Sequence, residues 1–186
     1  MNRFENWFCA SSFWRGMTRK HVLPWVLSGV DLGNHVLELG AGPGAATEEL
    51  RKRAPRVTSL EYDHKFAANL AARFPGANGA VLQGDASALP FPENTFSSAI
   101  AILMLHHLRS QEAQERAFAE VFRVLRPGGL FLALEIQDSW LNRISHIRST
   151  FTPVNASSAP ARLASAGFSN VSLKFRSGAY CLRAVR

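Results

Sequence analysis

Short apolar runs alternate with segments of helical periodicity along this chain, and the alternation predicts a layered α/β fold. Strands are expected at 36–40, 57–61, 80–83, 97–103, 130–136, 170–176 and 179–185. Helices are expected at 45–53, 64–73, 111–125 and 158–166, and Pro55, Pro75 and Pro127 follow three of them, where proline ends helices. The pattern therefore predicts a Rossmann-like, mostly parallel sheet of seven strands with helices on both faces.

The end of the chain predicts a departure from the parallel arrangement. Only Ser177 and Gly178 separate the last two expected strands, which indicates a tight hairpin and an antiparallel last strand. The length of 186 residues suits a single domain with a real core. Within it, residues 1–33 are expected to form an N-terminal helical segment that covers or packs on the main domain, and residues 34–186 the main domain itself.

The most informative motif is the stretch from Val36 to Gly44, which reads VLELGAGPG, a strand running into a glycine-rich turn. Closely spaced glycines leave no side chain between the backbone and a ligand. Such a loop serves either a dinucleotide or S-adenosylmethionine (SAM). Glu38 favours SAM, because a carboxylate repels a pyrophosphate and attracts the ammonium and sulfonium groups of SAM.

Three further motifs follow in order along the chain. The segment 57–61, VTSLE, ends in an acid 21 residues after Gly40, where doubly wound folds bind ribose hydroxyls. The segment 80–86, AVLQGDA, ends a third strand with Asp85, an acid suited to the amino group of adenine. The segment 123–132, RVLRPGGLFL, joins a helix to the fifth strand through a Pro-Gly-Gly turn.

Because these four motifs occur in this order, the chain resembles the class I SAM-dependent methyltransferases over roughly residues 34–136. The resemblance is in particular to the small UbiE-like (methyltransferase type 11) branch. The resemblance implies SAM as cofactor and S-adenosylhomocysteine as product. By motif position it implies these contacts: Glu38 with the amino group of SAM through water, Gly40, Ala41, Gly42 and Gly44 under the methionine part, Glu61 with the ribose, Tyr62 against adenine, Asp85 and Ala86 at the adenine edge, and the backbone of Leu103 closing the pocket.

Two features depart from the family pattern. Glu61 stands where aspartate is common, and the region after the fifth strand is short and rich in serine. Relatives often place their acceptor-binding helices in that region, so the resemblance assigns no particular methyl acceptor.

Candidate groups for acting on an acceptor follow the fourth and fifth strands. His106, His107 and Glu135 are expected at the carboxyl edge of the sheet, where they would orient or deprotonate a hydroxyl. The alternative is that one histidine caps the loop and the other packs beneath it. The apolar run 101–105, AILML, replaces the signature of enzymes that methylate exocyclic amines, which favours a small, apolar or lipid-like acceptor.

Two other functions stay open at this point. A SAM-binding protein without catalysis, serving as a partner or regulatory subunit, would carry the same cofactor motifs. A nucleotide-dependent oxidoreductase would account for Gly40, Gly42, Ala45 and Glu61, but would leave Glu38, Asp85 and the terminal hairpin unexplained.

Charge is distributed unevenly along the chain. The formal net charge is +7, and no acidic residue follows Asp138, whereas seven basic residues do. This basic quarter is either a solvated face or a site for an anionic partner. The basic residues form no dense run with interleaved aromatics, which argues against nucleic acid.

The N-terminal segment carries aromatic residues at helical spacing, flanked by basic ones. They are Phe4, Trp7, Phe8 and Trp14, with Ser11 on the same face. Three interpretations stay open: a membrane-surface helix, a lid over the cofactor, or a helix packed in the core. A weak association with anionic membranes is the hypothesis that connects this segment with the basic quarter.

The remaining signals place the protein in the cytoplasm, with a peripheral membrane position as the alternative. No secretory leader pattern and no apolar run long enough to span a membrane are present. Cys9 and Cys181 give neither a disulfide framework nor metal-binding spacing, so no metal is expected. The oligomeric state is left open.

Overall fold

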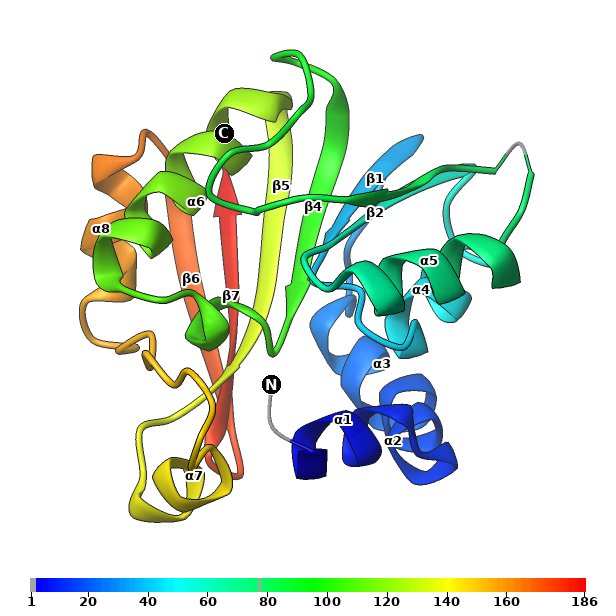
Figure 1. Ribbon diagram of the computed structural model, residues 1–186. Coiled ribbons are helices and arrows are strands. Elements are labelled where there is room, and N and C mark those ends of the chain that lie inside the picture. The colour runs from blue at the N-terminus through cyan, green and yellow to red at the C-terminus, as the bar shows by residue number, and fades with distance from the viewer. Residues whose placement is uncertain (1–2, 77) are drawn as a thin grey trace.

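The sheet that carries the fold has seven strands in the order β3-β2-β1-β4-β5-β7-β6 in the computed structural model, which describes residues 3–76 and 78–186 (Figure 1). The strands are β1 (His35–Leu39), β2 (Arg56–Glu61), β3 (Val81–Gln83), β4 (Phe96–Ile102), β5 (Leu125–Ile136), β6 (Ser169–Arg176) and β7 (Ala179–Val185). All seven lie within a few residues of their expected positions, and the largest difference is that β5 already begins at Leu125.

The direction of the strands confirms the predicted mixed sheet. Strands β1 to β5 pair in parallel, while β7 lies between β5 and β6 and is antiparallel to both. The strand order reverses between β1 and β4, so their carboxyl ends diverge there. In open α/β sheets this divergence leaves a crevice for ligands.

The helices between the strands also match the periodicity of the sequence. They are α4 (Ala45–Leu50), α5 (His64–Arg73), α6 (Gln111–Val124) and α8 (Ala159–Ser165), with a short 3-10 turn η2 (Leu105–His107) after β4 and α7 (Trp140–Ser145) after β5. Several begin with a side-chain cap: Asp63 accepts from the backbone N–H groups of Lys65 and Phe66, and Ser110 accepts from that of Ala113. Such caps satisfy N–H groups that the helix itself leaves unpaired.

The N-terminal segment is a series of short helices rather than one continuous helix. It comprises α1 (Arg3–Ala10), α2 (Ser12–Met17), the π-helical turn η1 (Thr18–Val22) and α3 (Leu23–Val26). Ser11 interrupts the helix, because its hydroxyl donates to the carbonyl of Phe8 and accepts from the N–H of Trp14. The expected aromatic face is therefore divided: Phe8 and Trp14 pack together with ring centroids 5.5 Å apart, whereas Trp7 is 67% exposed. The side chain of Phe4 lies outside the described residues.

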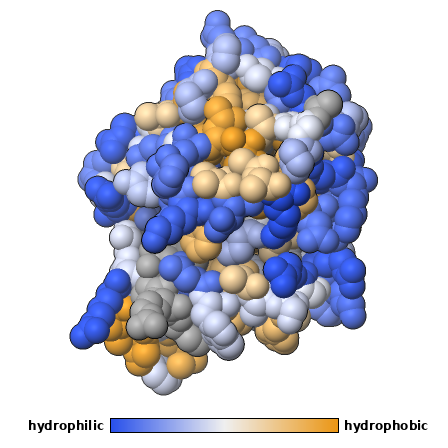
Figure 2. Space-filling model, turned by 45° about the vertical axis from the view of Figure 1, so that its right-hand side comes forward, coloured by the Kyte–Doolittle hydropathy of each residue, from blue (hydrophilic) through white to orange (hydrophobic). Residues whose placement is uncertain are grey.

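Helices α1, α2 and α7 lie near the lower end of the molecule in Figure 1, beyond the carboxyl ends of the parallel strands. Large apolar side chains are exposed on these helices and just after them: Trp7, Phe13, Trp140, Leu141, Ile144 and Ile147. Figure 2 shows apolar side chains gathered at this end of the surface. No helix in the described ranges is long and apolar enough to cross a membrane.

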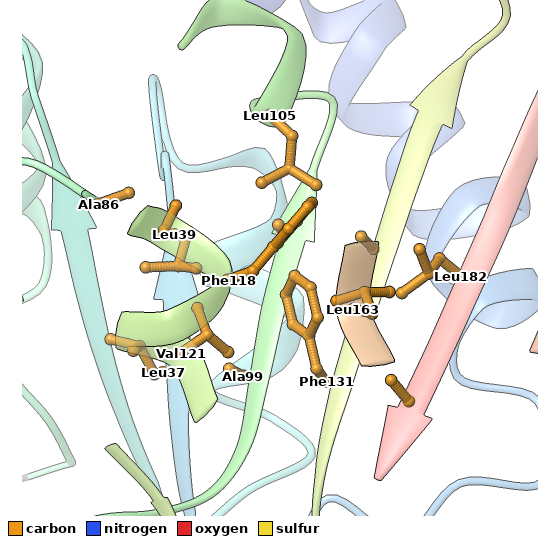
Figure 3. Packing of buried hydrophobic residues seen from close by; sticks show 14 of the residues in the cluster. Leu37, Leu39, Ala86, Ala99, Leu105, Phe118, Val121, Phe131, Leu163 and Leu182 are labelled. Carbon is orange, nitrogen blue, oxygen red and sulfur yellow. The ribbon is translucent and has the colours of Figure 1, made fainter. Parts of the chain in front are cut away.

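Buried side chains cover both faces of the sheet, because successive residues of a strand point to opposite sides. On one face Phe118 and Val121 of α6 and Leu163 of α8 pack against Leu37 and Phe131 (Figure 3). On the other face the core includes Val22, Leu23 and Leu50, which belong to η1, α3 and α4, together with Val36 and Leu132 of the sheet. The N-terminal segment thus contributes to the core through η1 and α3.

Candidate functional site

A cavity of about 880 Å³ opens at the carboxyl edge of the sheet. Its walls come from the turn after β1, the ends of β2 and β4, the segment after β3, and the helices α1, α2 and η1. Of the thirteen residues singled out from the sequence, eleven line this cavity: Glu38, Gly40, Ala41, Gly42, Glu61, Tyr62, Asp85, Ala86, Leu103, His106 and His107. Gly44 and Glu135 are not among the lining residues.

The glycine turn has the tight backbone path that its sequence predicts. Gly40 has a positive φ of 68°, and a Cβ atom there would come within 2.6 Å of the Cβ of Met104. The N–H groups of Gly40 and Ala41 both donate to the carbonyl of Leu60, which ties the turn to β2. Gly44, with φ of 83°, precedes α4, and a Cβ atom there would lie 2.2 Å from a methyl of Leu70. Glycine is required at both positions by conformation and by space.

Glu38 is a buried carboxylate that connects three elements beneath this turn. Its Oε2 accepts hydrogen bonds from the hydroxyl of Thr47 on α4 at 2.7 Å and from that of Ser59 on β2 at 2.6 Å. The side chain is only 2% exposed, and burial raises the pKa of the carboxyl above its ordinary value, partly offset by the two hydroxyl donors. A cation placed in the cavity would stabilise the charged form of this group.

Glu61 ends β2 and accepts hydrogen bonds from the backbone that follows β1 and from the backbone that follows β2. Its Oε2 accepts from the N–H of Gly42 at 2.7 Å, and its Oε1 accepts from the N–H of Asp63 at 2.8 Å. The carboxylate therefore holds the glycine turn while it lines the cavity. Each carboxylate oxygen can accept a second hydrogen bond, so ribose hydroxyls could still be bound here.

Another part of the cavity wall is formed by the segment after β3, by Tyr62 and by Arg109. Oδ1 of Asp85 accepts from both the N–H and the hydroxyl of Ser87, which fixes the carboxylate, and Ala86 is buried beside it. Tyr62 is exposed, and its hydroxyl accepts from Nη2 of Arg109 at 3.0 Å while the guanidinium lies 5.9 Å from the ring centre. No local motif in the sequence marked Arg109.

Two polar groups of the N-terminal helices face the same cavity without a partner. Oδ1 of Asn6 and Oγ1 of Thr18 are buried and have no hydrogen bond, and both residues line the cavity. A buried polar atom without a partner is costly, so these atoms call for a ligand that supplies donors or acceptors. Neither residue stood out in the sequence, because a single Asn or Thr in a helical segment carries no local signal.

The wall beyond the glycine turn is apolar. Leu103 and Met104 follow β4, and Leu103 adopts a positive φ of 53°, which is rare for a branched side chain. The N–H of Leu103 donates to the carbonyl of Leu134, which holds this conformation against β5. Phe8, Trp14 and Ile136 extend the apolar lining. This part of the cavity therefore suits a ligand with an apolar body.

His106 and Glu135 form a buried pair at the far end of the cavity. Nδ1 of His106 lies 2.5 Å from Oε2 of Glu135, and Oε1 of Glu135 accepts from the N–H of Leu105 at 2.8 Å. The two residues are 2% and 1% exposed. Glu135 contacts the imidazole of His106 and is not among the residues that line the cavity, so its direct contact with an acceptor stays a prediction.

Two more imidazoles surround His106. Nδ1 of His107 lies 3.2 Å from the carbonyl of Thr150, and Nδ1 of His146 lies 2.6 Å from the carbonyl of Asn142. Burial, with His106 beside it, lowers the pKa of His107 to about 3. His146 also lies 3.7 Å from a carboxylate oxygen of Glu5 on α1 and stacks on Phe151. His146 was missed because it lies 39 residues beyond His107, in the irregular stretch after β5.

Comparison with known proteins agrees with this geometry. Residues 37–133 match the family model described as methyltransferase domain. A probable S-adenosylmethionine-dependent methyltransferase of Mycolicibacterium smegmatis is 34% identical over 123 residues, covering 66% of this chain and 44% of that protein. A demethylmenaquinone methyltransferase of Chlamydia trachomatis is 35% identical over 105 residues, covering 55% of this chain and 44% of that protein.

The solved structures agree on the fold. A SAM-dependent methyltransferase from Aquifex aeolicus superposes with a TM-score of 0.77 at 16% identity, covering 100% of this chain and 98% of that one. This chain spans less than half the length of the two curated relatives. The family model matches more than half of the chain, so the chain belongs to the class I SAM-dependent methyltransferases, in the UbiE-like branch.

The site residues fit the cofactor of this family. The buried carboxylate of Glu38 suits a cationic amino acid end, and the unpartnered atoms of Asn6 and Thr18 offer further polar contacts in the same cavity. The acids at the ends of β2 and β3 suit a ribose and an adenine, respectively.

Proposed function

We propose that this chain transfers a methyl group from SAM to a small acceptor with an apolar body. The observation that carries the proposal is the cavity itself, in which the polar family motifs and the buried histidines open onto one space. Ligand pockets commonly have volumes of about 300–1,000 Å³. A cavity of 880 Å³ lies near the upper end of that range and leaves room for two ligands side by side.

The cofactor-binding residues are those of the glycine turn and the strand ends. Glu38 would attract the ammonium group, Glu61 the ribose hydroxyls, and Asp85 with the Ala86 N–H the adenine edge. Tyr62 and Arg109, joined by their hydrogen bond, would cover the adenine at the mouth. SAM supplies a methyl group on a positively charged sulfur, so the main task of the protein is to hold the acceptor in line with it.

His106 is the residue we propose to act on the acceptor. Glu135 accepts from its Nδ1, so in the neutral imidazole Nε2 carries the lone pair that can bind the hydrogen of a hydroxyl. A base that is held in one orientation can take the hydroxyl proton as the oxygen gains its methyl group. His107 stands beside it on the cavity wall. The segments α1, α2 and η1 would exclude water from this end, as a lid.

The acceptor is proposed to be lipid-like and to arrive from a membrane surface. Trp140, Leu141 and Ile144 of α7 are more than half exposed, and the residues after Asp138 carry only positive charge. An exposed apolar face with basic neighbours suits an anionic membrane surface. Trp7 of α1 and Phe13 of α2 are exposed, and these two helices lie at the same end of the molecule as α7 and also line the cavity.

Product analysis with methyl-labelled SAM tests the proposal. The protein would be incubated with a series of phenols and quinols of increasing apolar chain length, and labelled products would be separated by chromatography. We expect labelled product and an equal amount of S-adenosylhomocysteine, with faster transfer to longer acceptors. Binding of SAM without transfer to any fraction of a cell extract would favour the alternative, a SAM-binding partner without catalysis.

A further inference from the structure

The three histidines at the end of the cavity form a cluster that the sequence does not reveal. His106 and His107 belong to η2, and His146 follows α7. One ring nitrogen from each residue, Nδ1 or Nε2, lies within 4.8 Å of a ring nitrogen of each of the other two. The ring centroids lie 4.3, 5.1 and 5.4 Å apart in the three pairs. Three imidazoles are therefore gathered around one point.

Each imidazole is held through the same nitrogen by an acceptor. Nδ1 contacts Oε2 of Glu135 in His106, the carbonyl of Thr150 in His107 and the carbonyl of Asn142 in His146. An acceptor at Nδ1 favours the proton there, so in the neutral imidazole Nε2 of each residue carries the lone pair. Histidine ligands of metal ions are held in this way, by a carboxylate or a carbonyl at the other nitrogen.

The surroundings suit a cation at this point. Three lone pairs brought together repel one another unless a positive charge lies between them. The carboxylates of Glu135 and Glu5 add negative charge, the first at 2.5 Å from His106 and the second at 3.7 Å from His146. Neutral imidazole binds Zn²⁺, Fe²⁺, Ni²⁺ and Cu²⁺, and does not suit Mg²⁺ or Ca²⁺.

We propose that Nε2 atoms of His106, His107 and His146 bind a divalent transition-metal ion of the zinc class. In a tetrahedral zinc site with bonds of about 2.0–2.1 Å the ligand nitrogens lie about 3.4 Å apart, so modest side-chain rotation closes the cluster onto the ion. Three protein ligands leave one position open, and all three residues line the cavity. The ligands come from segments distant in the sequence, which is why the spacing of residues gave no metal signal.

The open position gives the ion a role in the proposed methyl transfer, and this part of the inference rests on that proposed function. A hydroxyl oxygen of the acceptor would occupy the position and lose its proton more easily there, because the ion stabilises the resulting oxyanion. The proton would leave to solvent, and the oxygen lone pair would form the new bond to the methyl carbon as the bond from that carbon to the sulfur of SAM breaks. The electron pair of the broken bond stays on sulfur, and S-adenosylhomocysteine is the leaving group. His106 then acts on the acceptor through the ion.

Metal binding is tested first, without SAM or acceptor. Protein stripped with a chelator would be titrated with Co²⁺, whose visible absorption reports tetrahedral nitrogen ligands, and then with Zn²⁺ as competitor. We expect one Co²⁺ per chain, displaced by Zn²⁺, and at least a tenfold weaker binding in both His107→Ala and His146→Ala. Glu135→Gln is expected to weaken binding about 10–100-fold. His21→Ala, which removes an exposed histidine from η1, is the matched control and should bind as the parent protein does.

Folding of each variant is checked by its thermal transition and by SAM binding, which these histidines are not proposed to contact. No Co²⁺ binding by the parent protein, or equal binding by a folded His107→Ala His146→Ala double variant, would overturn the metal site. Equal transfer rates in stripped and reloaded protein would overturn the role of the ion while leaving the site in place. Absence of transfer under every condition, with metal binding intact, would instead overturn the proposed function.

Discussion

The N–H of Gly42 donates a 2.7 Å hydrogen bond to Oε2 of Glu61, and this contact joins the glycine turn to the end of β2. Glu61, which we propose to bind the ribose, is thus also a structural support of the turn beside it. Glu38 likewise supports the structure while it lines the cavity, because it links β1, β2 and α4 through two hydroxyl donors. The site is therefore shaped before any ligand enters, which lowers the cost of ordering it on binding.

The pKa of Glu38 predicts opposite effects of one substitution on stability and on binding. Burial raises this pKa in the folded protein, so the carboxyl stabilises the fold when protonated at low pH and loses that contribution as pH rises through the folded-state pKa. Glu38→Gln keeps the shape without the charge. We expect a higher free energy of unfolding than the parent at pH 7–8, a smaller difference near pH 4–5, and weaker SAM binding.

Urea unfolding at several pH values and calorimetric titration with SAM measure the two effects. Glu48→Gln, on the same helix as Thr47, removes a half-exposed carboxylate that makes only surface ion pairs; it is the control and should leave SAM binding unchanged and stability within about 0.5 kcal/mol. Unchanged SAM affinity in Glu38→Gln would show that the carboxylate supports the turn alone.

The two glycines Gly40 and Gly42 form a matched pair for testing the turn. Both have positive φ, but a Cβ atom at Gly40 would collide with Met104, whereas nothing lies within 4 Å at Gly42. A left-handed alanine alone costs about 1–2 kcal/mol. We expect Gly42→Ala to lose about that much stability and Gly40→Ala clearly more, measured by urea unfolding. Equal losses would mean that Met104 moves aside at no cost.

Much of the fold was predictable because local pattern and tertiary structure agree. The strands and the four main helices follow apolar periodicity, and Pro55, Pro75 and Pro127 mark where helical periodicity stops. The N-terminal segment was less predictable, because the hydroxyl of Ser11 competes for backbone partners and breaks a pattern that the aromatic spacing alone suggested.

The candidate site was predictable only where its residues follow one another in the chain. Glu38, the glycine turn, Glu61 and Asp85 sit at strand ends in recognisable motifs, and they line one cavity. Thr18, Arg109 and His146 reach that cavity from separate segments. Their spacing in the sequence does not predict that they line the same cavity. The position of Glu135 behind His106 depends on the register of β4 and β5 and needed the structure.

Substitution of the buried pair separates chemistry from cofactor binding. Glu135 accepts from two N–H groups, those of Leu105 and His106, and a glutamine has only one oxygen for them. Glu135→Gln should therefore misorient the imidazole. We expect kcat to fall about 10–100-fold in Glu135→Gln and 100–10,000-fold in His106→Asn, with SAM affinity within about threefold of the parent. Full activity in a folded His106→Asn would remove this residue from the chemistry.

The exposed face of α7 predicts a salt-sensitive membrane association. Replacing Trp140 and Leu141 by serine removes two side chains that are 68% and 60% exposed, so the fold should be unaffected. Flotation with anionic and neutral vesicles should show binding of the parent to anionic vesicles at low salt, loss at high salt, and weak binding of the double variant. Phe175→Ser removes another exposed aromatic side chain and is a control for general loss of apolar surface. Equal flotation of parent and double variant would exclude α7 as the contact.

Calorimetric titration of the protein with SAM, with NAD as the competing candidate, tests the identity of the cofactor most directly. We expect SAM binding in the micromolar range, no competition by NAD, and a loss of about 10–100-fold in both Asp85→Ala and Glu61→Ala, because a polar group of the bound ligand would lose its partner. His64→Ala, an exposed residue at the start of α5, is the control and should bind as the parent does. Tight binding of NAD without binding of SAM, or SAM affinity that neither acid affects, would contradict the assignment of this cavity as a SAM site.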